Sequence, residues 1–142
     1  MDLTRHAELY VIMTVIYQEL SDFGYLQKKD NTLSSRNFKT LAADLLDCEE
    51  KEVPVFVENT IAYSLSKYGE IVAAYVPFLK KWTWDRLPML TQAILLMSYS
   101  HYFFVEKVHK SIVISTAVDF AKRYVDEAQA KFINAILDKV LK

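Results

Sequence analysis

Apolar residues recur at helical spacing along most of this chain. The first such segment, from about Thr4 to Phe23, is apolar on most of its circumference, a pattern typical of a helix at the centre of a bundle. Gly24 stands where it can end that helix as the residue beyond the C-cap. Residues 27–36 are polar and lack periodicity, so they predict a long loop. A second helix is predicted from about Ser35 to Asp47.

Prolines and a glycine mark the expected borders in the middle of the chain. Pro54 is placed to open a third helix at its first turn. We expect this helix to pause near Gly69, before Pro77 ends or kinks the segment. Its predicted apolar stripe consists of Val57, Ile61, Leu65 and Tyr68.

The C-terminal half has the clearer pattern. Pro88 is expected to open one helix, and the next helix begins at about Ser111. Asp126 followed by Gln129 has the form of a capping box, so a last helix is predicted from Glu127 to about Leu141. The stripe predicted for the helix that begins near Ser111 consists of Ile114, Ala117, Val118, Ala121, Tyr124 and Val125.

Composition supports a purely helical interpretation. The 142 residues include only two glycines and three prolines, whereas a sheet protein needs turn residues roughly every 8–12 positions. The 52% share of hydrophobic residues and the 25% share of charged residues are typical of a folded protein. We therefore predict an all-α bundle of six to seven helices that forms a single domain over residues 1–142.

Charge and hydropathy narrow the range of partners. A net charge of −1 provides no global basic field for indiscriminate nucleic-acid binding. The longest nearly apolar run, Leu9 to Tyr17, is about half of the length needed to cross a bilayer. The start of the chain also lacks the pattern of an export signal. We expect a cytoplasmic protein that does not contact a membrane.

No catalytic or metal-binding motif is present in the sequence. His101 and His109 would share a face only on an unbroken helix, and residues 106–110 look like a break between two helices. Cys48 is the only cysteine, and the carboxylates beside it are expected to raise its pKa and disfavour the thiolate. We therefore expect no enzyme activity, no metal and no cofactor. A small helical enzyme whose site no motif reveals is the remaining functional class.

Trp82 and Trp84 lie among the basic residues Lys80, Lys81 and Arg86. Such a cluster can stack on bases and neutralise phosphates. Large aromatic side chains more often bury area where structural elements meet. Of these two interpretations, we expect the second, in which both tryptophans pack at a junction between helical layers.

Four blocks of the C-terminal half carry a family resemblance. They are W-T-W-D-R-L-P at Trp82–Pro88, A-I-L-L-M-S-Y-S-H-Y at Ala93–Tyr102, I-S-T-A-V-D-F-A-K-R-Y at Ile114–Tyr124 and K-F-I-N-A-I-L-D at Lys131–Asp138. In order and spacing they resemble the NusB family of bacterial transcription antitermination factors, which are small all-helical RNA-binding proteins. The block V-I-Y-Q-E-L-S at Val15–Ser21 is also similar to the first helix of that family. The resemblance implies a NusB-like helical bundle.

The resemblance also implies boxA-type RNA and a ribosomal protein of the NusE type as partners. In the family, an arginine-rich start contacts RNA phosphates, and a Lys-Phe pair in the last helix lies near the RNA. The corresponding positions here are Arg5 and His6 at the start, and Lys131 and Phe132 in the last helix. Asn134 also matches, and it either bonds a neighbouring loop or reaches a partner. These five residues form the predicted RNA-binding set.

The start of the chain departs from the family pattern. Residues 1–23 hold one arginine against four carboxylates, a formal charge of −3. RNA affinity falls with each phosphate contact that is lost. The alternative interpretation is therefore a NusB-fold interaction module that has lost RNA binding and acts through protein contacts or as a homodimer.

Overall fold

The computed structural model describes residues 4–30 and 38–142, with side chains for residues 4–22 and 38–142. Seven α-helices lie in the described part of the chain, where no strand occurs, and this confirms the predicted all-α class. They are α1 (Arg5–Asp30), α2 (Phe38–Leu46), α3 (Val55–Ser66), α4 (Tyr68–Tyr75), α5 (Met89–Ser100), α6 (Lys110–Tyr124) and α7 (Glu127–Val140). Short helical turns join them, namely η1 (Glu50–Glu52), η2 (Val76–Phe78), η3 (Trp84–Arg86) and a π-helical turn, η4 (His101–Val105).

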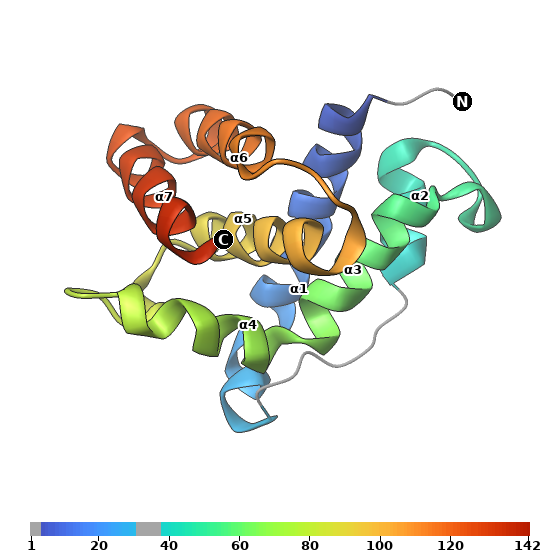
Figure 1. Cartoon of the computed structure of the whole chain (residues 1–142). Coiled ribbons are helices and arrows are strands. Elements are labelled where there is room, and N and C mark those ends of the chain that lie inside the picture. The colour runs from blue at the N-terminus through green and yellow to red at the C-terminus, as the bar shows by residue number, and fades with distance from the viewer. Residues whose placement is uncertain (1–3, 31–37) are drawn as a thin grey trace.

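Helices α1 and α5 form the centre of the bundle (Figure 1). Helix α1 packs on α5, α3 and α2, while α5 also contacts α6, α4 and α7. Residues of α1 are buried on most of its circumference between Leu9 and Leu20, so the predicted central position of the first helix is confirmed. Every residue of α5 from Thr91 to Ser98 is buried. Helices α6 and α7 pair with each other on the opposite side of α5 from α2 (Figure 1).

The predicted end of the first helix is wrong. Helix α1 continues through Gly24 to Asp30, and no glycine in the described residues has a left-handed backbone. Glycine permits a helix to end but does not require it, so the hydrogen-bonded ladder continues. Residues 27–30 of the predicted loop are therefore helical, and residues 31–36 lie outside the described residues. Helix α2 ends at Leu46, followed by Asp47 with a φ of 54°.

In the middle of the chain, the helix borders lie at the prolines rather than at the glycine. Pro54 was predicted to lie in the first turn of α3. It is the N-cap instead, so the helix begins one residue later, at Val55. The break between α3 and α4 falls at Lys67, so Gly69 lies inside α4 rather than at a pause. Pro77 lies in η2, which directly follows the last residue of α4.

The buried face of α6 differs from the predicted stripe. Tyr124 is 41% exposed, whereas Val113 and Phe120, which the stripe omits, are buried. Helix α6 packs against both α5 and α7. The side of α6 that is buried depends on where these two helices lie, and the spacing of apolar residues alone does not give that direction. The predicted positions Ala117 and Ala121 are buried.

The last helix begins as predicted, with one difference in its cap. The Asp126 carboxylate accepts a hydrogen bond from the Gln129 backbone N–H at 2.7 Å. The Gln129 side chain does not return to the cap; its Oε1 accepts a hydrogen bond from Thr91 Oγ1 at 2.9 Å. This bond connects the first turn of α7 to α5.

In the described part of the chain, no helix is long and apolar enough to cross a membrane.

Candidate functional site

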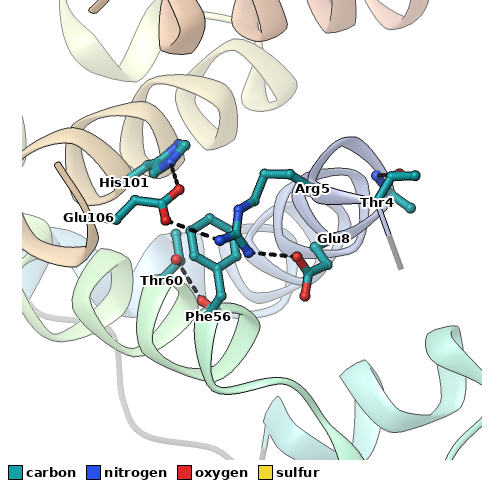
Figure 2. Close-up of polar contacts among 8 residues, drawn as sticks. Thr4, Arg5, Glu8, Phe56, Thr60, His101 and Glu106 are labelled. Atoms are coloured by element: carbon teal, nitrogen blue, oxygen red, sulfur yellow. Dashed lines mark hydrogen bonds and ion pairs between the residues drawn. The ribbon is translucent and has the colours of Figure 1, made fainter. Parts of the chain in front are cut away.

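Arg5 is held at the start of α1 by three groups (Figure 2). Its Nη1 lies 2.7 Å from Glu8 Oε1, and its Nη2 lies 3.0 Å from Glu106 Oε2. The guanidinium carbon also lies 3.7 Å from the centre of the Phe56 ring, a cation-π distance. One cation thus joins α1, α3 and the segment that follows η4. Two of its donors thus bond carboxylates of the same chain, although the side chain remains exposed.

His101 completes this cluster from the interior. Its Nε2 lies 2.8 Å from Glu106 Oε1, and its ring meets the Phe56 ring edge-on at 5.1 Å. Burial lowers the pKa of His101 below 6.5, an effect that the Glu106 hydrogen bond and charge partly oppose and that Arg5 reinforces. The neutral imidazole, as a hydrogen-bond donor to Glu106, is therefore the favoured form at neutral pH.

The two histidines considered as metal ligands have separate roles. His101 belongs to the cluster just described, whereas His109 is the N-cap of α6 and accepts a hydrogen bond from the Ser111 backbone N–H. Among the described residues, no group of three or more His, Cys, Asp or Glu side chains is arranged to hold a metal ion. Burial, followed by the charges of Glu52 and neighbouring carboxylates, raises the pKa of Cys48 and disfavours its thiolate.

His6 faces α6 rather than α3. Its Nε2 lies 3.3 Å from Asp119 Oδ2, and its ring meets Phe120 edge-on at 4.8 Å. Asp119 also pairs with Arg123 one helical turn further on, at 3.3 Å. Both predicted binding residues at the start of the chain therefore have carboxylate partners within the protein.

The two tryptophans have different environments. Trp84 is 6% exposed, stacks on Tyr75 at 6.0 Å and donates its indole N–H to the Tyr68 hydroxyl at 3.0 Å. The prediction that it packs at a junction is confirmed. Trp82 is 50% exposed, so the same prediction is wrong for this residue. The tertiary packing leaves Trp82 accessible to a ligand.

Trp82 lies at the edge of a hollow between the α4–α5 connection and α7. The hollow has a volume of about 290 Å³, and we call it the basic-aromatic hollow. None of the carboxylates in the described residues lines it. Its lysines, like Lys131, form no ion pair within the described chain. The lining residues are Phe78, Lys80, Lys81, Trp82, Phe132, Ala135, Ile136 and Lys139.

The five predicted binding residues do not form one surface. Phe132 lines the basic-aromatic hollow, and Lys131 is exposed on the same helix, one turn before Ala135 of the hollow. Asn134 lines a different groove, of about 550 Å³, between α6 and α7. Arg5 and His6 make their contacts on α3 and α6.

Lys139 and Phe78 line the hollow but were not among the residues singled out from the sequence. Lys139 follows Phe132 by seven positions, a spacing that places both on one side of a helix and that was available from the sequence. Phe78 has no comparable signal, because only the fold of the α4–α5 connection brings it to α7.

Comparisons with known proteins agree with this fold. The model of the NusB family matches residues 10–142, which include the whole hollow but exclude Arg5 and His6. The transcription antitermination protein NusB of Lacticaseibacillus paracasei is 36% identical over 90 residues, covering 63% of this chain and 67% of that protein. The protein of the same name from Exiguobacterium sp. is 33% identical over 97 residues, covering 68% and 74%.

Solved structures show the same arrangement of helices. T. maritima NusB superposes with a TM-score of 0.74 at 17% identity, covering 99% of this chain and 92% of that one. A chain from the crystal structure of a plectonemic RNA supercoil superposes with a TM-score of 0.75 at 20% identity, covering 96% and 92%. At these identities the likeness establishes the fold alone. Because the family model extends over nearly the whole sequence, this chain belongs to the NusB family of transcription antitermination proteins.

Proposed function

We propose that this NusB-family protein binds boxA-type RNA through the basic-aromatic hollow, together with a ribosomal protein of the NusE type. In this proposal it works in the cytoplasm and catalyses no reaction. The observation that carries it is one hollow that combines a half-exposed tryptophan with lysines that form no ion pair among the described residues. Lys131 and Phe132 belong to this face.

Local charge supports a phosphate ligand despite the net charge of −1. Lys80, Lys81 and Lys139 converge on the hollow without a lining carboxylate among the described residues. Three phosphate contacts to a single strand correspond to a slope of log affinity against log salt of about −2. This is a modest electrostatic contribution, so base stacking must supply part of the affinity.

Aromatic side chains provide surfaces for such stacking. Trp82 is half-exposed at the edge of the hollow, and Phe78 and Phe132 contribute further apolar area. Stacking on an aromatic side chain is worth about 1–3 kcal/mol per base and tolerates any base. The hollow therefore suits unpaired RNA bases flanked by phosphates.

Arg5 and His6 contribute less in this proposal than the sequence interpretation expected. Each lies beside a carboxylate of the protein that offsets its positive charge toward a phosphate, and each lies before the first residue that the family model matches. The same observation favours one other function. A NusB-fold module whose chain start is bound internally would act through protein contacts or as a homodimer, without RNA.

Filter binding of boxA-type RNA at increasing salt separates the two functions. The wild-type protein should bind with a slope of about −2, and Lys81→Ala should flatten the slope by about 0.7. Lys107→Ala is the matched control, because Lys107 is exposed, forms no ion pair within the described residues and lies outside the hollow. Arg5→Gln should leave the slope unchanged. Absence of RNA binding at low salt would support the interaction module instead.

A further inference from the structure

Another concave surface lies between α1, α2 and α6. It has a volume of about 390 Å³, and we call it the α1–α2–α6 groove. Ala7, Val11 and Leu46 form its less exposed part. Its remaining lining residues are His6, Tyr10, Leu45 and Tyr124.

Three large apolar side chains border this groove while remaining open to solvent. Tyr10 and Tyr124 are each 41% exposed, and Leu45 is 43% exposed. They come from three different helices, and contiguous exposed apolar surface of this kind is typical of protein interaction sites. Tyrosine in particular is enriched at interfaces.

The aromatic wall of the groove is held in place before any partner arrives. The Tyr10 ring lies 5.6 Å from the Tyr124 ring and 6.4 Å from the buried Phe120 ring. The His6 ring packs edge-on against the same Phe120 ring at 4.8 Å. Because these rings restrict one another, a partner loses little binding free energy to ordering this wall.

Exposed carboxylates outside the lining flank the opposite wall, formed by Leu45 and Leu46, and we call this side the acidic wall. Leu45 and Leu46 lie in the last turn of α2, between the exposed residues Asp44 and Asp47. Residues 44–52 together hold five carboxylates against one lysine, a formal charge of −4. The last turn of α2 has no basic residue, so the negative end of the helix dipole adds to this field.

This charge pattern decides between the occupants. RNA phosphates would be repelled by the acidic wall. A second copy of this chain would have to present the same patch in a two-fold interface, which would bring two acidic walls together. A basic protein segment meets neither obstacle.

We propose that the α1–α2–α6 groove docks a basic segment of a partner protein, one that inserts an apolar side chain between Tyr10, Leu45 and Tyr124 and places lysines or arginines over the acidic wall. This goes beyond the proposed function, which assigns no surface to a protein partner. It is independent of RNA, because the groove and the basic-aromatic hollow share no residue.

Two labelled helical peptides provide the test. Both carry leucines at helical spacing; one has lysines at the remaining charged positions and the other has glutamates. Fluorescence anisotropy should show the lysine peptide binding at least about tenfold more tightly. Backbone amide shifts in NMR spectra of the protein should change around Ala7, Tyr10 and Leu45.

Three variants locate the binding. Leu45→Ser should lower the affinity for the lysine peptide by about tenfold. Asp44→Asn combined with Asp47→Asn should lower this affinity several-fold and reduce its salt dependence. Asparagine suits position 47, since it tolerates the left-handed backbone found there. Ile112→Ser, at a 57% exposed site on α6 outside the groove, should bind like the wild type.

Several results would overturn the proposal. These are equal affinity for the two peptides, no binding of either, or binding that Leu45→Ser leaves intact. Competition by boxA-type RNA, or a dimer that Leu45→Ser dissociates in sedimentation, would assign the groove to RNA or to a second copy. RNA filter binding by Leu45→Ser should match the wild type, so failure of the RNA proposal remains distinguishable from failure of this one.

Discussion

Substituting each of the two neighbouring tryptophans in turn tests which one contributes to RNA binding and which one to stability. Trp82→Ala removes the ring of a residue that is 50% exposed at the hollow, and Trp84→Ala removes the ring of one that is only 6% exposed. The residues are two positions apart and chemically identical. Any difference between the variants therefore reports the environment of each ring rather than the substitution.

The structure gives the two changes different magnitudes. Loss of a buried aromatic ring costs about 3–5 kcal/mol, and Trp84→Ala also removes the indole donor to the Tyr68 hydroxyl. This is a large share of the roughly 5–15 kcal/mol that stabilises a domain. Trp82→Ala should cost about 1 kcal/mol or less. Its effect on RNA should instead match one lost stacking contact, about 1–3 kcal/mol, which is about 5- to 150-fold in affinity.

Urea unfolding followed by circular dichroism measures the first quantity, and filter binding of boxA-type RNA at fixed salt measures the second. Trp84→Ala should unfold at much lower urea but, in water and below its melting temperature, should bind RNA like the wild type. If this variant does not fold, Trp84→Phe replaces it with a milder cavity. RNA affinity that Trp82→Ala leaves unchanged, with the protein folded, would refute stacking at the hollow.

Three further outcomes follow from buried contacts. Tyr75→Phe removes a fully buried hydroxyl that donates to the Leu95 carbonyl at 2.7 Å. The free energy of unfolding measured in urea should therefore fall by about 1–2 kcal/mol. The pKa of His101 is lower in the folded protein than its ordinary 6.5. Its contribution to the free energy of unfolding is therefore complete above about pH 6.5 and is lost as the pH falls toward the folded pKa. The melting temperature should accordingly fall between about pH 7.5 and 5.5, and less so in His101→Gln, which lacks the titrating group. Asp126→Ala removes the α7 cap and should cost about 1 kcal/mol in urea unfolding, whereas Asp126→Asn should retain most of it.

Helix starts were predictable because capping depends on a few neighbouring residues. Pro54 and Pro88 stand at the N-caps of α3 and α5, and Asp126 caps α7 as its spacing to Gln129 predicted. Helix ends were less predictable. Gly24 lies inside α1, and the left-handed residue that follows α2 is Asp47 rather than a glycine. A residue that tolerates a termination geometry does not by itself impose it.

The candidate site could be predicted only in part. The sequence identified Lys131 and Phe132 from the family resemblance, and it placed Trp82 in a basic cluster without separating it from Trp84. Which tryptophan is open depends on Tyr75, whose ring stacks on Trp84 and not on Trp82. That contact joins α4 to η3 and leaves no trace in local periodicity.

Composition, spacing and short-range capping were enough to predict the helical class, most helix starts and the family. Which charged groups are available to a ligand depends instead on how the helices pack. Packing placed Arg5 between Glu8 and Glu106 over Phe56, although Glu106 is far away in the sequence. The same packing left Lys80 and the other lysines of the hollow without an acidic partner among the described residues. Ion pairing depends on distances of a few ångströms between residues on different helices, and such distances exist only once the chain has folded.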